Sequence, residues 1–107
     1  MSKSFVIVLC IVMVSCNYHS ADSCITSTSF INDVYPIIIN NCSLDGCHVS
    51  GSVIGNLADY DILKQKVDEG KLYYVLFENP LMPPDTMLKE NDLKIIECWL
   101  KDGAQNN

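Results

Sequence analysis

The feature that most constrains this chain is a short motif in which two cysteines stand close together and a histidine follows the second. It spans residues 42 to 48 and has the sequence CSLDGCH. Four residues separate Cys42 from Cys47, so the backbone must fold back on itself if both thiols act on one bound group. Gly46 favours such a loop, because glycine adopts positive φ without a steric penalty. The motif therefore predicts a site at which two thiols and the imidazole of His48 meet.

A covalently attached haem fits this chemistry. The thiols of Cys42 and Cys47 can add to its two vinyl groups, and His48 beside the second thiol can bind the iron as its proximal ligand. From the motif alone, two other interpretations stay open. Cys42 and Cys47 form a small disulfide loop, or the two thiolates and the imidazole supply three of the four ligands of a structural zinc.

Residues 1 to 15 have the form of an export signal. Lys3 gives a positive start, and residues 5 to 14 are an unbroken apolar run that is too short to span a bilayer. The leader ends in MVSC, which resembles the lipobox of bacterial lipoproteins and makes Cys16 the predicted lipidation site. A signal peptide cut near Ser20 or Ala21 is the alternative. We expect an exported protein, held by lipid on the periplasmic or cell-surface side of a bacterial membrane, with residues 16 to 28 as its tether.

Export changes which bonds the cysteines are expected to form, because disulfides and covalently attached haem are both found in oxidising compartments outside the cytoplasm. Of the six cysteines, one leaves with the leader and Cys16 takes the lipid. If a haem takes Cys42 and Cys47, then Cys24 and Cys98 are left to pair with each other. Without haem, the four remaining cysteines allow three connectivities that the sequence does not separate.

The mature chain is acidic. Residues 16 to 107 carry all 13 acidic residues, six of the seven lysines and no arginine, which gives a formal charge of −7. This charge argues against nucleic acid and anionic lipid as partners, and it favours a protein partner with a basic docking surface. A solvated acidic surface with no partner is equally consistent with it.

Several segments have helical spacing of apolar residues. Residues 30 to 41 form the first, and Pro36 requires that this helix be kinked or begin near that point. Asp59 can cap a second helix that runs to residue 69 and stops at Gly70. Residues 72 to 77 continue at helical spacing, although a short buried strand also fits them. A last helix is expected from residue 90 to 102, with Trp99 on its buried face.

The sequence LMPP at residues 81 to 84 is the second informative stretch. Two prolines restrict the backbone to extended conformations, so Met82 is presented from a stiff loop. A thioether held in this way suits the sixth coordination position of a haem iron, where it raises the reduction potential. The alternative is that Met82 fills a gap in the core. Met87 is a second candidate for the same ligand role.

Taken together, these residues resemble the monohaem cytochrome c domain, in the short form found in exported bacterial lipoproteins. The resemblance covers roughly residues 30 to 105 and rests on the order and spacing of VYPII, CSLDGCH, MPP and IIECWL with its following Gly103-Ala104. It implies a small all-α fold over residues 29 to 107, wrapped around one covalently bound haem c. Cys42 and Cys47 would carry this haem, with His48 and Met82 as the axial ligands. The chain departs from the family's pattern in the four-residue gap between the cysteines and in Lys89, where the family has a serine or similar helix cap.

Three functional hypotheses follow. The first is a membrane-anchored electron carrier, not itself an enzyme, in which His48 and Met82 stay bound to the iron and a redox protein docks on the acidic surface. The second is a haem-based sensor of small ligands or a weak peroxidase, in which Met82 dissociates. The third is a haem-free, disulfide-stapled binding module on the cell surface.

Overall fold

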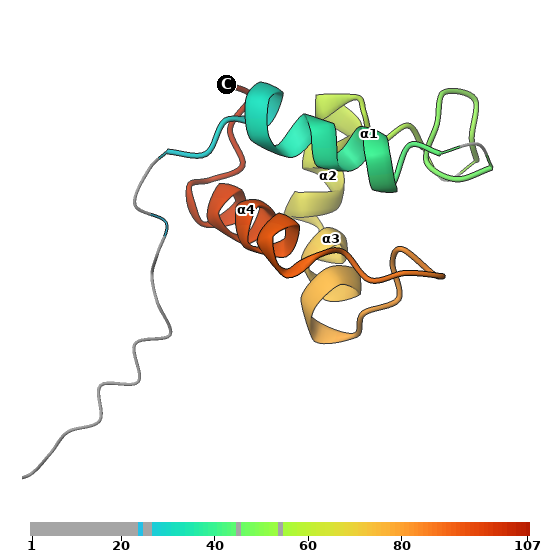
Figure 1. Ribbon diagram of the computed structural model, residues 1–107. Helices are drawn as coiled ribbons and strands as arrows, with labels where there is room; N and C mark the ends of the chain where they lie inside the picture. Colours follow the sequence, from blue (N-terminus) through green and yellow to red (C-terminus); the bar gives the residue numbers. More distant parts are fainter. Residues whose placement is uncertain (1–23, 25–26, 45, 54) are drawn as a thin grey trace, which may run out of the picture.

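The computed structural model describes residues 24, 27–44, 46–53 and 55–107. Over these residues the chain forms helices and no strand, so the expected all-α class is confirmed (Figure 1). The elements in chain order are η1 (Phe30–Val34), α1 (Tyr35–Asn41), α2 (Tyr60–Asp68), α3 (Lys71–Tyr73), η2 (Tyr74–Glu78) and α4 (Glu90–Lys101), where η marks a π-helical turn.

The first helical segment changes its hydrogen-bond pattern just before Pro36. The turn η1 begins after Ser29, whose hydroxyl oxygen accepts a hydrogen bond from the backbone N–H of Asn32 at 3.1 Å. Helix α1 then starts at Tyr35, which puts Pro36 in its first turn, where no helical N–H is required. A helix start near the proline, one of the two expected outcomes, is therefore observed. The end of α1 delivers Cys42 to the loop of the CSLDGCH motif.

Helix α2 has the boundaries that its capping residues predict. A carboxylate oxygen of Asp59 accepts hydrogen bonds from the backbone N–H groups of Asp61 at 2.9 Å and Ile62 at 3.3 Å. Gly70 follows the helix with a φ of 73°, a left-handed conformation that glycine adopts readily. The chain is thereby redirected into α3.

The segment after Gly70 is helical throughout. Helix α3 leads directly into η2, and Leu72 and Leu76 are buried one turn apart. The alternative of a short strand at residues 72 to 77 is therefore wrong. A helix keeps both leucines on the same side of the segment, where they line a cavity described below.

Helix α4 packs its apolar face against the first helical segment. Trp99 is fully buried, its ring centroid lies 5.7 Å from that of Phe30 in η1, and its indole N–H donates to the carbonyl oxygen of Gln105 at 2.9 Å. The expected core position of Trp99 is confirmed. The buried core consists of Phe30, Val34, Ile37, Ile38, Leu57, Leu63, Leu72, Leu76, Leu88, Ile96, Trp99 and Ala104.

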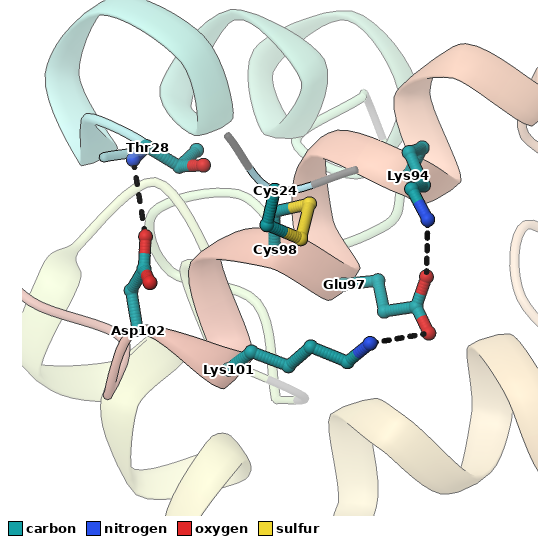
Figure 2. Close-up of a disulfide and its surroundings, with 7 residues drawn as sticks. All are labelled: Cys24, Thr28, Lys94, Glu97, Cys98, Lys101 and Asp102. Carbon is teal, nitrogen blue, oxygen red and sulfur yellow. Dashed lines mark hydrogen bonds and ion pairs between the residues drawn. A yellow bond between two sulfur atoms is a disulfide. The ribbon is translucent and has the colours of Figure 1, made fainter. Parts of the chain in front are cut away.

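A disulfide joins Cys24 to Cys98, so the segment before η1 is tied to the last helix (Figure 2). This is the pair that remains when Cys42 and Cys47 are reserved for a haem. Close to it, the backbone N–H of Thr28 donates to a carboxylate oxygen of Asp102 at 3.2 Å. The start of the described domain is thus held against α4 by a covalent bond and a hydrogen bond.

The expected leader at residues 1 to 15, the predicted lipidation site Cys16 and most of the tether at residues 16 to 28 lie outside the described residues. Within the part that the structure describes, no helix combines the length and the apolar character needed to cross a bilayer.

Candidate functional site

A cavity of about 430 Å³ lies where the end of α1, the helices α2, α3 and η2, and the loop after η2 meet. Small-molecule sites have volumes of about 300–1,000 Å³, so it is large enough for a ligand. In Figure 1 the loop after α1 and the loop before α4 extend on the same side of the molecule. The described lining residues are Asn41, Cys42, Gly46, Cys47, His48, Leu57, Lys66, Lys71, Leu72, Val75, Leu76, Met82, Pro83 and Pro84.

Backbone hydrogen bonds fold the CSLDGCH motif into a compact loop. The N–H of His48 donates to the carbonyl oxygen of Cys42 at 3.0 Å, and the N–H of Cys47 donates to that of Leu44 at 2.9 Å. Gly46 has a φ of 78°, in the left-handed region where the Cβ of other residues meets steric strain. The four-residue gap is therefore compatible with both cysteines and the histidine lining one cavity.

His48 is held by its backbone while its side chain has an unused hydrogen-bonding atom. Its carbonyl oxygen accepts from the N–H of Leu57 at 3.2 Å. Its Nδ1 atom is buried and has no hydrogen-bond partner among the residues that the structure describes. Leaving a buried polar atom unpaired costs free energy, so such atoms are few in folded proteins and one explanation for them is a missing bound group. This marks the imidazole as a candidate ligand-binding group.

The two motif cysteines are free thiols in this structure, so the small disulfide loop is not formed. Burial, together with the neighbouring Cys47, raises the pKa of the Cys42 thiol to about 11. Zinc binds the thiolate form of cysteine. Among the described residues, no three histidine, cysteine or acidic side chains form a group that could hold a metal ion. The protein side chains therefore do not support the zinc interpretation.

The loop after η2 brings Met82 to the same cavity. The backbone N–H groups of Leu81 and Met82 both donate to the carbonyl oxygen of Val75, at 3.0 and 3.3 Å. Met82 is 39% exposed and lines the cavity, whereas Met87 is 64% exposed and is not among the described lining residues. Of the two candidate methionines, Met82 is thus the one that shares a cavity with His48.

These residues fit a haem in their chemistry. The cavity offers two thiols for the vinyl groups, an imidazole and a thioether for the iron, and an apolar wall of leucine, valine and proline for the ring. All four residues that the sequence singled out, Cys42, Cys47, His48 and Met82, line it.

Two lysines of the cavity were not anticipated from the sequence. Lys66 lies in α2 and Lys71 is the first residue of α3. A signal for Lys66 was present, because it stands three residues after the fully buried Leu63 and so shares its side of the helix. Nothing local in the sequence marked Lys71, because its place in the cavity depends on how α3 packs.

Comparison of the chain with protein-family models, with curated proteins and with solved structures finds no match.

Proposed function

We propose that this protein is an exported, lipid-anchored c-type cytochrome that carries one electron. The observation that supports it best is the shared cavity of Cys42, Cys47, His48 and Met82, because the first three come from one loop and Met82 comes from another. An arrangement in which Met82 filled the core would instead bury it, and it is 39% exposed.

Each residue has a separate task in this proposal. The thiols of Cys42 and Cys47 would hold a haem through thioether bonds to its two vinyl groups. The imidazole of His48 and the thioether of Met82 would bind its iron. A bound haem supplies an iron that alternates between the ferrous and ferric states. With both of these side chains bound to the iron, no position would be open for a substrate, so the proposed role is that of a carrier and not of an enzyme.

The proposed location and partner have support of their own. The disulfide between Cys24 and Cys98 is of the kind that persists in oxidising compartments, as export to the periplasm or cell surface would provide. Lipid on Cys16 would hold the domain at the membrane surface. The formal charge of −7 over residues 16 to 107 favours a redox protein with a basic docking surface. Association with that partner is expected to weaken as salt is added.

The first experiment is to export the protein from a host with haem-attachment machinery, and to measure a haem stain and the intact mass after denaturation. We expect one haem on the wild type and none on the Cys42→Ala, Cys47→Ala variant. The matched control is Cys24→Ala, Cys98→Ala, which also removes two cysteines and should keep the haem. An unmodified mass with all four cysteines oxidised to disulfides would overturn the proposal and favour a haem-free surface module.

A second experiment compares Met82→Ala with Met87→Ala in the haem-loaded protein. We expect Met82→Ala to lower the midpoint potential, because a methionine ligand raises it, and to open the reduced iron to carbon monoxide. Met87→Ala should change neither, since its side chain lies outside the described lining of the cavity. The opposite pattern would assign the ligand role to Met87.

The partial exposure of Met82 also favours a second candidate function, a small-ligand sensor or weak peroxidase. Such a protein must release its methionine easily. If carbon monoxide shifts the reduced spectrum of the wild type as readily as that of Met82→Ala, this second function is the better description.

A further inference from the structure

The two charged side chains in the described lining of the cavity are both lysines, and the carboxylate of Glu69 lies beside Lys71 outside that lining. Of the described residues that line the cavity, only Lys66 and Lys71 carry a full charge, and no acidic residue is among them. The chain has 13 acidic residues and seven lysines. A described lining with two lysines and no acidic residue therefore differs from the composition of the chain as a whole. The cavity therefore suits an occupant that is apolar over most of its surface and carries negative charge.

Lys66 is placed to supply one of these charges. It lies three residues after Leu63 on the inner side of α2 and is half-buried. Within the described part of the chain it forms no ion pair, unlike Lys64 on the same helix, which pairs with Asp68. The pKa of Glu69 is lowered by its hydrogen bond with Lys71, and the charge of Lys66 adds a smaller contribution to that shift. The methylene groups of a lysine can pack along an apolar wall while its ammonium group contacts a polar group or water.

Lys71 supplies the second charge from a different element. It opens α3, and its ammonium nitrogen lies 2.6 Å from a carboxylate oxygen of Glu69. Its side chain is 64% exposed, so its ammonium group has hydrogen-bonding capacity left for a second anion. The turn at Gly70 separates the two elements and brings both lysines to one cavity.

We propose that Lys66 and Lys71 bind the carboxylate groups of the occupant, which are the two propionates if it is a haem. This rests on the proposed function for the identity of the occupant. A carboxylate that enters an apolar cavity loses hydration, and a nearby ammonium group offsets that loss. The lysines thereby hold the acidic edge of the group and place two positive charges close to it.

The test uses haem-loaded protein with Lys66→Gln, Lys71→Gln and the double variant. Removing a positive charge near the iron favours its oxidised form, so the midpoint potential should fall, with a shift in the oxidised-to-reduced ratio of roughly two- to tenfold for each lysine. Lys66→Arg and Lys71→Arg keep the charge and should restore the wild-type potential. Lys64→Gln is the matched control, because it removes the same charge from α2 at a position outside the described lining of the cavity.

A second readout does not depend on redox chemistry. In the haem-loaded protein, acylation of lysine amines followed by peptide mass spectrometry should label Lys66 more slowly than in the haem-free Cys42→Ala, Cys47→Ala variant, while Lys64 is labelled equally in both. The inference would be overturned if Lys66→Gln and Lys71→Gln changed the potential no more than Lys64→Gln does, and if Lys66 were labelled equally in the haem-loaded and haem-free proteins. Haem would still be attached in that case, so the outcome differs from failure of the proposed function, in which the wild type carries no haem.

Discussion

At the scale of single residues, the Cys42 thiol has the chemistry most altered by its surroundings. Burial is the larger cause of its raised pKa of about 11, and Cys47 adds to it. Because the thiolate is the nucleophile, only roughly one Cys42 side chain in a thousand is reactive at pH 8. In haem-free Cys47→Ala protein, which keeps the burial but lacks the smaller contribution of Cys47, we expect slow alkylation of Cys42 at pH 8, with a rate that rises about tenfold per pH unit until the pH approaches the pKa of the buried thiol. Mass spectrometry of quenched samples measures this rate.

The control is the same variant unfolded in urea. Unfolding removes the burial, so the thiol returns to its ordinary pKa and alkylation at pH 8 becomes faster. Equal rates in the folded and unfolded chain would mean that Cys42 is not shielded in the folded protein.

At the scale of elements, α4 lacks a side chain that caps its first turn. Lys89 occupies the N-cap position with extended backbone, φ −61° and ψ 148°, and its side chain makes no capping hydrogen bond. A serine there can accept from a free backbone N–H of the first turn, as Asp59 does for α2. We expect Lys89→Ser to raise the free energy of unfolding by about 1 kcal/mol, measured by urea denaturation.

Lys89→Ala separates the cap from the charge. It removes the positive charge from the helix N-terminus, where a cation is unfavourable, but it adds no acceptor. If Lys89→Ala stabilises the protein as much as Lys89→Ser, the gain comes from the charge and not from capping.

At the scale of the whole molecule, the Cys24–Cys98 disulfide closes a loop across 74 positions of the chain. A crosslink over such a distance restricts the unfolded chain strongly, and losing a native disulfide from a small exported domain typically costs about 2–5 kcal/mol. We expect Cys24→Ser to lower the free energy of unfolding by about that amount. Urea denaturation of the haem-loaded protein provides the measurement, because the folded and the unfolded chain then carry the same covalently attached haem.

Wild-type protein in which the disulfide has been chemically reduced is the matched control, since this treatment breaks the same bond without substituting a residue. It should lose a similar amount of stability. A Cys24→Ser variant as stable as the wild type would show that the hydrogen bonds around Thr28 and Asn107 hold the start of the domain without the crosslink.

Much of the local structure was predictable from the sequence because neighbours along the chain determine it. Asp59 and Gly70 bound α2 through a side-chain cap and a left-handed residue, both of which act within one helical turn. The spacing of apolar residues through Trp99 placed α4 to within one residue of its end. The CSLDGCH motif likewise brings its thiols and imidazole together within a single loop.

What the tertiary structure decided concerns residues far apart in the chain. Residues 72 to 77 fitted a helix or a strand by pattern alone, and in the structure they are helical, with Leu72 and Leu76 both in the buried core. Met82 shares the cavity with His48 because two backbone hydrogen bonds tie its loop to Val75, and no local pattern records that tie.

The sequence by itself therefore determined α2 and α4, the capping of α2 and the chemistry of the motif, since these depend on interactions across a few residues. Only the tertiary structure decided which methionine and which lysines meet the motif, because that depends on how α2, α3 and the loop after η2 pack around one cavity.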